Sequence, residues 1–383
     1  MSLQKRKIRI LAVLAILCLT AAGCGGAPAS PSASATPPAA AAGDGWYDAP
    51  EWSWRMQVIH TTGQDDFKQN QEAADLIYQA TRGRMKIEIV PNGTIVPSTE
   101  GFQACGEGVM EMHNSWAMYA KGVEYSLLPM TTQGLGMDAI DRYTWLYCAG
   151  GEEILQEALD KLNVKLLANE IWGTEVMMSK KPFQSLEDMN GAKMRTSDPR
   201  LLATYNIGGI TLPLEEVFTA FSTGTVDSAE FGHLRYDKDL GLVDVSNYAI
   251  WPDFWNGHFD TTVVVNKDAW NSLPADIQLI VEMAFKSMEH KHLFLSQYDS
   301  ALDYRDLTES GKLEFIRMDP ETFVQGRQRM YEIEKQDMEQ YGGLTEKAYQ
   351  SMHDFMELWY PYKTISAWWG TGLTADEQLG YTP

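Results

Sequence analysis

Short strand-like segments alternate with amphipathic helical segments through most of this 383-residue chain, and this alternation restricts its fold more than any other feature. Residues 54–59 alternate polar and apolar side chains as a strand does, and residues 65–82 carry apolar side chains at helical spacing. Residues 85–90 read as a second strand that ends in a turn-forming Pro-Asn-Gly. This order of elements predicts an α/β protein. We expect further strands at 110–115, 164–168, 175–179, 193–195, 228–231 and 261–266, and further helices at 98–106, 214–223, 274–309 and 320–341.

The N-terminus has the layout of a secretory signal peptide over residues 1–23. Basic residues at positions 5, 6, 7 and 9 precede an apolar run over residues 10–22. The run is shorter than the roughly 20 residues that span a bilayer as a helix, so we favour a cleaved leader over a transmembrane anchor. It ends in Ala-Ala-Gly-Cys, which resembles a bacterial lipobox. We therefore predict a lipid on Cys24, with ordinary cleavage near the same place as the alternative.

Composition divides the rest of the chain into a linker, a folded body and a tail. Residues 24–45 are rich in Ala, Pro, Ser and Gly, and such a segment buries too little apolar surface to fold. Residues 46–365 exceed the size of a usual single core, so we expect two lobes, followed by a C-terminal tail at 366–383. A lipid on Cys24 would hold the body at the outer face of the cytoplasmic membrane, in the periplasm or at the cell surface.

Cys105 and Cys148 are the cysteines that remain once Cys18 leaves with the leader and Cys24 is lipidated. Disulfides persist in exported proteins, so these two residues are candidates for a disulfide. Two buried, unpaired cysteines are the alternative.

The chain is strongly acidic, with 52 acidic against 31 basic residues and a formal net charge of −21. This charge argues against nucleic acid and anionic lipid surfaces as partners, and an anionic ligand would need a dedicated local cation. The sequence lacks a Gly-x-Ser-x-Gly elbow, a His-Glu-x-x-His helix and a Cys-x-x-Cys pair, which mark common enzyme classes. We therefore favour a binding protein over an exported enzyme.

Two sequence blocks carry a family resemblance. Residues 186–195 read Leu-Glu-Asp-Met-Asn-Gly-Ala-Lys-Met-Arg, similar to the D-L-K-G-L-K-x-R signature of the solute receptors of TRAP (tripartite ATP-independent periplasmic) transporters. Residues 217–231 resemble the x-Y-x-A-L-x-x-G-x-V-D-G-x-E block of the same receptors. The resemblance extends over essentially the whole folded body and is closest to the 2-oxo-acid receptors of the DctP family.

The resemblance implies a two-lobe, periplasmic-binding-protein-like α/β fold with a long helix that crosses both lobes. Lobe I would take residues 46–171 and 262–305, and lobe II residues 172–261 and 306–365. It also implies a receptor that binds a small organic carboxylate, such as a 2-oxo, 2-hydroxy or aromatic monocarboxylic acid, between the lobes. The receptor would deliver this ligand to the small and large membrane subunits of a TRAP transporter. Presentation of the ligand to a sensor kinase or to another transporter is the alternative.

The same resemblance assigns Arg195 to the ligand carboxylate, as one half of a bidentate ion pair. A planar guanidinium offers two parallel donors, which suits this role in an acidic protein. Phe231 would supply an apolar wall. Residues 251–257 resemble the Y-P-G-W-W-E-G stretch of 2-oxo-acid receptors, which places Trp255 and Asn256 near the ligand, with Asn256 replacing a Glu.

A metal ion beside the ligand is a further implication. The 2-oxo-acid receptors hold it with a Glu that matches Glu230 and a Gln that aligns with Thr174 here. Glu175 stands beside the missing Gln, so a sodium or calcium ion held by Glu230 and Glu175 is a candidate, and no other cofactor is expected. An orienting role of Glu230 towards Arg195 is the alternative.

Three residues of the first lobe follow strand ends, where open α/β sheets place ligands: His60, Asn92 and Trp116. A satisfied structural histidine is the commoner role for a residue such as His60. Packing in the core is the simpler role for an aromatic residue such as Trp116.

Overall fold

The computed structural model describes residues 49–132, 136–251 and 258–366. The chain separates into residues 1–45 and residues 46–383, and the fold below belongs to the second unit. The leader, the linker with Cys24, the residues Trp255 and Asn256, and residues 367–383 lie outside the described residues. Among the helices that are described, none is long and apolar enough to cross a membrane.

The first sheet contains five strands in the order β2-β1-β3-β10-β4. β1 (Trp52–Val58) pairs in parallel with β2 (Met85–Val90) and β3 (Met112–Ser115). β10 (Phe259–Asn266) pairs antiparallel with β3 and with β4 (Val164–Trp172). Every residue of β10 is buried, as is usual for a strand inside a sheet that is covered on both faces.

The second sheet contains six strands in the order β11-β9-β5-β8-β6-β7. β6 (Lys193–Arg195) pairs in parallel with β7 (Gly208–Ile210) and β8 (Ser228–Glu230). β5 (Met177–Ser179) runs antiparallel to β8 and to β9 (Tyr248–Trp251), and β9 pairs in parallel with β11 (Glu314–Arg317). Since β6 and β8 are parallel neighbours, their last residues, Arg195 and Glu230, lie at the same edge of the sheet.

Shorter helices connect the strands and cover the sheets. α4 starts with a capping box, in which Asp138 and Asp141 satisfy backbone donors of the first turn. The connections of the first half are α1 (Asp65–Ala80), η1 (Ser98–Glu100), α2 (Gly101–Gly106), η2 (Ala117–Ala120), α3 (Leu127–Thr132), α4 (Ala139–Cys148), α5 (Gly151–Asp160) and α10 (Lys267–Asn271). Those of the second half are α6 (Arg200–Ala203), α7 (Leu214–Ser222), α8 (Leu234–Asp239) and α9 (Leu242–Val245).

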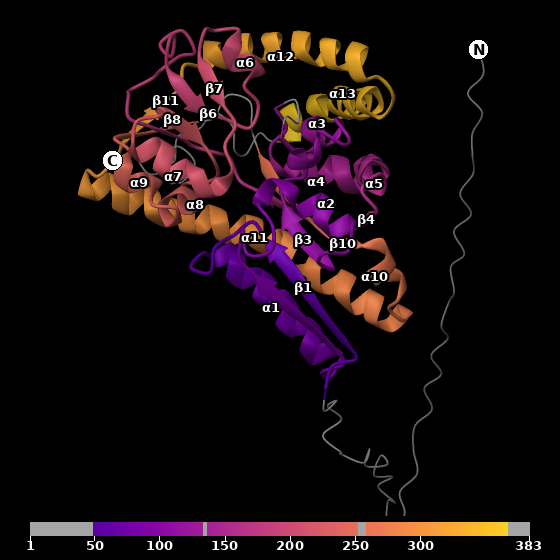
Figure 1. The fold of residues 1–383 in the computed structure, drawn as a ribbon. Helices are drawn as coiled ribbons and strands as arrows, with labels where there is room; N and C mark the ends of the chain where they lie inside the picture. The colour runs from indigo at the N-terminus through magenta and orange to yellow at the C-terminus, as the bar shows by residue number, and fades with distance from the viewer. Residues whose placement is uncertain (1–48, 133–135, 252–257, 367–383) are drawn as a thin grey trace, which may run out of the picture. The chain divides into compact units, whose positions relative to one another are not determined.

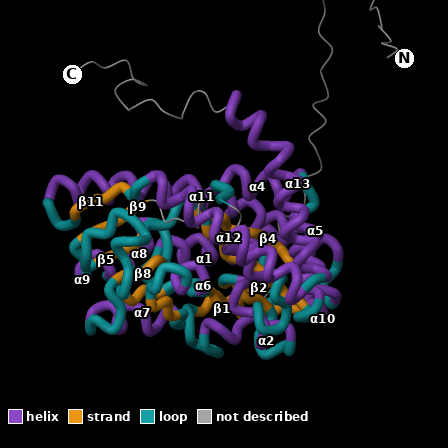
Figure 2. Tube along the Cα trace, turned by 90° about the horizontal axis from the view of Figure 1, so that it is seen from above, coloured by secondary structure: helices purple, strands orange, loops and turns teal. Residues whose placement is uncertain are grey.

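A 36-residue helix, α11 (Ala275–Ser310), runs across both halves (Figure 1). Pro274 precedes its first turn, and Gly311 ends it with a φ of 65°, a conformation that glycine adopts without strain. The helix packs against α1 and β4 of the first half and against α8 of the second. Figure 2 shows the strands β5, β8, β9 and β11 grouped apart from β1, β2 and β4. The expected two-lobed α/β architecture with a long crossing helix is confirmed.

The last two helices connect the halves in a way that the sequence reading missed. α12 (Pro320–Tyr341) packs against α6 of the second half, but α13 (Gly343–Ser366) packs against α3 and α5 of the first. Met352 and Phe355 of α13 join the core that contains Trp145. The prediction that residues 306–365 all belong to the second lobe is therefore wrong for α13, because its apolar face is buried on the first.

The docking of α13 is testable with a core substitution. Met352→Ala should lower the free energy of unfolding by at least about 2 kcal/mol, because the side chain is fully buried in this contact. Leu358→Ala is the matched control, since Leu358 is 79% exposed on the same helix and should change stability by less than about 0.5 kcal/mol. Urea denaturation followed by circular dichroism measures both values. Equal effects of the two substitutions would contradict this docking.

The two cysteines are free thiols, so the candidate disulfide between Cys105 and Cys148 is not formed. Cys105 is buried in α2, where its thiol donates to the Glu111 carbonyl at 3.5 Å, whereas Cys148 is exposed at the end of α4. Burial raises the pKa of the Cys105 thiol well above its usual value. Cys105 is therefore a core residue with little reactivity.

Candidate functional site

Arg195 ends β6 with its side chain almost completely buried, at 2% exposure. Its Nη1 donates to the Glu230 carbonyl at 2.7 Å, and its guanidinium carbon lies 4.3 Å from the centroid of the Phe231 ring. Nε and Nη2 are buried and have no hydrogen-bond partner among the described residues. These two nitrogens form one edge of the guanidinium, so the free edge has the geometry that binds a carboxylate through two parallel hydrogen bonds.

Glu230 holds the loop after β6 and also orients Arg195. Its Oε1 accepts hydrogen bonds from Thr196 Oγ1 at 2.9 Å, Ser197 N at 2.6 Å and Ser197 Oγ at 2.9 Å. Its Oε2 is buried without a hydrogen-bond partner in the described part of the chain. One carboxylate oxygen of Glu230 thus has a structural role, while the other is left to bind a ligand or an ion.

Two more buried acids lie near this guanidinium, Glu175 at 1% exposure and Asp237 at 0%. Neither carboxylate oxygen of Asp237 has a hydrogen-bond partner within the described ranges. Burial raises the pKa of Asp237 well above its usual value, the charge of Glu175 raises it further, and Arg195 opposes the rise. Asp237 was not predicted from the sequence, because a single acid in a short helix carries no motif.

Arg195 packs on Phe231, which belongs to a cluster of aromatic rings. The Phe231 ring lies edge-to-face with Trp116 at 5.1 Å and stacks with Tyr236 at 5.8 Å between centroids. Trp116 Nε1 and the hydroxyls of Tyr119 and Tyr236 are buried without hydrogen-bond partners among the residues described. Burial raises the pKa of Tyr119 to about 12, against the opposing charge of Arg195, so its hydroxyl keeps its proton. The cluster therefore combines apolar walls with several unused donors, as small-molecule sites do.

The sequence-predicted site residues fall into three groups. Arg195, Glu230, Phe231 and Trp116 lie together, and Glu175 joins them through its electrostatic effect on Asp237. Thr174 is half-buried next to Glu175 in the chain. Trp255 and Asn256 lie outside the described residues.

His60 and Asn92 adjoin this cluster through Tyr236, whose ring lies 5.9 Å from that of His60. The backbone nitrogen of Asn92 donates to the His60 carbonyl at 3.1 Å, so the two residues are adjacent. The imidazole of His60 stacks on Trp172 at 5.6 Å and faces Asp66, with 3.9 Å between His60 Nδ1 and Asp66 Oδ2. Neither residue is in hydrogen-bond contact with Arg195 in the structure.

Residues 59–340 match the family model of the bacterial extracellular solute-binding proteins, family 7, or DctP. The chain belongs to this family. A relative of this DctP protein is the monocarboxylate 2-oxoacid-binding periplasmic protein of Nostoc sp., which is 28% identical over 254 residues. That alignment covers 66% of this chain and 69% of the relative.

Solved structures of TRAP transporter solute-binding proteins share the fold. One, from Bordetella bronchiseptica, superimposes with a TM-score of 0.75 at 22% identity, and the match covers 83% of this chain and 95% of the Bordetella chain. The Bordetella structure contains calcium and picolinate. Another, from Pseudoalteromonas atlantica, has a TM-score of 0.76 at 21% identity, and the match covers 84% of this chain and 99% of the Pseudoalteromonas chain. That structure contains sodium and pyruvate. The family resemblance and the fold class inferred from the sequence are confirmed.

Proposed function

We propose that this DctP-family protein is the extracytoplasmic receptor of a TRAP transporter and binds a small organic carboxylate at Arg195. The observation that carries the proposal is the buried guanidinium whose Nε and Nη2 have no partner among the described residues. A buried charge of this kind is expensive unless it is paired, and a ligand carboxylate would pair it. The Nostoc relative and the two solved structures, whose names record a 2-oxoacid, picolinate and pyruvate, support the same class of ligand.

The surroundings of Arg195 favour a short or planar ligand. Phe231 and Trp116 offer flat apolar surfaces, against which a short or planar ligand would pack. The hydroxyls of Tyr119 and Tyr236 would donate to a 2-oxo or 2-hydroxy oxygen. We therefore propose a 2-oxo, 2-hydroxy or aromatic monocarboxylic acid.

A cation beside the ligand follows from the local charge. The Arg195 guanidinium lies in a cluster that also buries the carboxylates of Glu175 and Glu230, and a bound ligand carboxylate adds another negative charge. Oxygen ligands from carboxylates suit sodium and calcium, and Glu230 Oε2 and the Asp237 oxygens have no other partner in the described residues. We propose that such an ion binds with the ligand, and the charge balance favours calcium over sodium.

The N-terminal features complete the proposal. A leader at residues 1–23 and a lipid on Cys24 would place the receptor at the outer face of the cytoplasmic membrane, tethered by residues 24–45. There it would deliver its ligand to the small and large TRAP membrane subunits. Mass spectrometry of the membrane-extracted protein tests the anchor, since the lipidated N-terminus should begin at Cys24.

A thermal-shift screen tests the proposed ligand class. The purified protein should be screened with 2-oxo, 2-hydroxy and aromatic carboxylates, each with calcium, with sodium and with a chelator. A ligand at about 1,000 times its Kd should raise the free energy of unfolding by about 4 kcal/mol. The matching uncharged amides are the control and should not stabilise the protein. Stabilisation by the amides as well, or by no carboxylate, would contradict the proposal.

A further inference from the structure

Asp66, His233 and His292 form a buried cluster away from Arg195. They belong to three elements: Asp66 lies in the first turn of α1, His233 precedes α8 as its N-cap, and His292 lies within α11. One donor atom from each residue lies within 4.8 Å of the other two. The closest approach is 3.0 Å, between His292 Nδ1 and Asp66 Oδ1. Their exposures are 5%, 2% and 1%, so the cluster is shielded from solvent.

A third imidazole, that of His60, faces the same carboxylate. His60 is fully buried, and neither of its ring nitrogens has a hydrogen-bond partner among the described residues. Nε2 of His233 and Nε2 of His292 are also buried without partners there. The ion pair between His292 and Asp66 uses His292 Nδ1, so it explains none of these nitrogens. Buried polar atoms are almost always paired, so these nitrogens call for a partner that the protein does not supply.

We propose that Asp66, His233 and His292, with His60 beside them, bind a divalent transition-metal ion of the zinc type. Two or three imidazoles with one carboxylate are donors that suit zinc, cobalt, nickel or copper, whereas calcium and magnesium prefer oxygen alone.

Ser300 is in place to position the His233 ring. Its hydroxyl lies 3.4 Å from His233 Nδ1, which also lies 3.2 Å from the backbone nitrogen of Tyr236. His233 can bind a metal through Nε2 only if the ring proton is on Nδ1. Nδ1–H would then donate a hydrogen bond to the Ser300 hydroxyl, and the hydrogen bond from the backbone nitrogen of Tyr236 would be lost. Such a partner to the second ring nitrogen is what fixes the tautomer of a metal-binding histidine.

The cluster is separated from the proposed solute site by aromatic rings. Trp172 lies 5.6, 5.4 and 5.2 Å from the rings of His60, His233 and His292. The Tyr236 ring lies between the two sites, 5.9 Å from that of His60 and 5.8 Å from that of Phe231. α1 belongs to the first half, His233 follows β8 of the second, and α11 crosses both. A bound metal would therefore link the two halves at the long helix.

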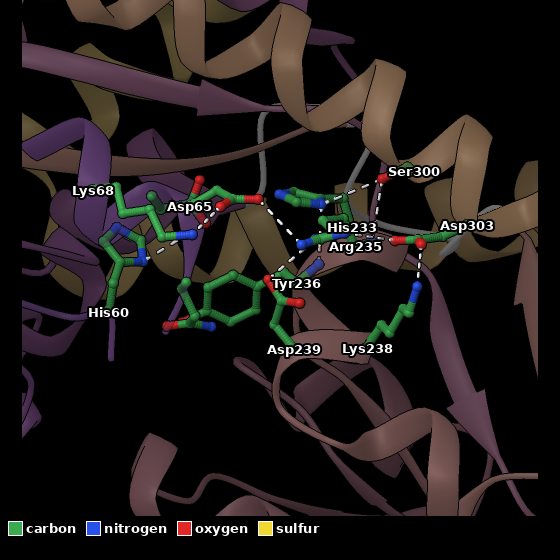
Figure 3. Close-up of polar contacts among 12 residues, drawn as sticks. His60, Asp65, Lys68, His233, Arg235, Tyr236, Lys238, Asp239, Ser300 and Asp303 are labelled. Atoms are coloured by element: carbon green, nitrogen blue, oxygen red, sulfur yellow. Dashed lines mark hydrogen bonds and ion pairs between the residues drawn. The ribbon is translucent and has the colours of Figure 1, made fainter. Parts of the chain in front are cut away.

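Charged residues continue this link at the periphery. Figure 3 shows Arg235 between Asp65 of α1 and Asp303 of α11. The guanidinium nitrogens of Arg235 lie 3.2 Å from the Asp65 carboxylate and 3.7 Å from that of Asp303. His233 and Tyr236 lie beside this network in the same view. The metal ligands thus come from elements that are already held together by ion pairs.

Metal titration of the purified, chelator-treated protein tests the proposal. Calorimetry with Zn²⁺ should show one equivalent bound, and Co²⁺ should give the intense visible absorption of a tetrahedral nitrogen and oxygen site. His292→Gln and His233→Gln should each weaken Zn²⁺ binding more than ~100-fold. Removing a residue that only hydrogen-bonds to a metal ligand already lowers metal affinity about 10–100-fold, and these substitutions remove the ligands themselves. Ser300→Ala should weaken it about 10-fold. His290→Gln is the matched control on the same helix, because His290 is exposed, and should bind as wild type does.

Several results would overturn the proposal. Wild-type protein that binds no Zn²⁺, or variants at positions 233 and 292 that bind as tightly as His290→Gln, would show that the cluster is a buried ion pair only. If circular dichroism shows that a variant does not fold, the Co²⁺ spectrum of the wild-type protein tests the proposal instead. Weak absorption, typical of octahedral Co²⁺, would exclude the proposed tetrahedral site. No carboxylate ligand is needed in these measurements, so their outcome is independent of the proposed solute.

Discussion

Arg195→Ala should reduce the affinity of the protein for its carboxylate ligand by at least about 100-fold, or roughly 3 kcal/mol. Without the guanidinium, the ligand carboxylate would be buried beside Glu230 and Asp237 with no cation to pair with it. Isothermal titration calorimetry with the carboxylate found by thermal shift measures this loss directly. Circular dichroism checks that the variant is folded.

A second substitution at position 195 separates the shape of the arginine side chain from its charge. Arg195→Lys keeps the charge but loses the planar fork, so its affinity should still fall by about 10-fold or more. Arg317→Ala is the control, because Arg317 is an exposed arginine of β11 in the same sheet, and its affinity should not change. Full affinity in Arg195→Ala would mean that the ligand binds elsewhere.

Arg142→Met should lower the free energy of unfolding by about 3–5 kcal/mol, because it leaves a buried carboxylate unpaired. Arg142 of α4 and Asp260 of β10 both have completely buried side chains. The guanidinium donates to Asp260 Oδ2 from Nη2 at 2.9 Å and from Nε at 3.3 Å, and it stacks over Trp145 at 4.7 Å. Chemical denaturation at pH 7 measures the loss.

The pH dependence of this loss identifies its cause. Burial raises the pKa of Asp260 from 3.8 to about 6, although Arg142 opposes the rise. Folded Asp260 thus binds its proton more tightly than the unfolded chain does, so its contribution to stability falls as the pH rises from about 4 to about 6. Without Arg142 its pKa rises further, and the deficit of Arg142→Met should be small at pH 4 and largest above pH 7.

A second substitution serves as the control for the ion pair. Arg142→Met combined with Asp260→Val removes both charges and should regain most of the lost stability, because an apolar pair of similar volume often replaces a buried ion pair at little cost. A deficit that is independent of pH, or a double variant as unstable as the single one, would assign the loss to packing alone.

Local patterns predicted the elements whose side chains follow a clear period. β2, β6 and α12 begin and end at the residues expected from the sequence, and α11 differs by one residue at each end. The helices α4 and α5 and the strand β11 were not predicted, because their burial depends on partners far away in the chain. α13 was assigned to the wrong lobe for the same reason, since its apolar face indicates burial but not the surface that covers it.

The candidate site was predictable where a motif marks it. Arg195, Glu230 and Phe231 lie within two recognisable blocks, and β6 and β8 bring these blocks together as parallel neighbours. Asp237 joins them only through the packing of α8, which no spacing in the sequence indicates. Likewise, residues 60, 66, 233 and 292 are brought together by the crossing of α11, so their cluster cannot be seen before the topology is known.

A crystal structure of the protein with its stabilising carboxylate tests the central claim most directly. We expect the two carboxylate oxygens to lie about 2.7–2.9 Å from Nε and Nη2 of Arg195. We also expect the ligand to lie between Phe231 and Trp116, with the Glu230 carboxylate close to it. A ligand held elsewhere, with the Nε and Nη2 edge of Arg195 paired to a carboxylate of the protein itself, would contradict the proposed function.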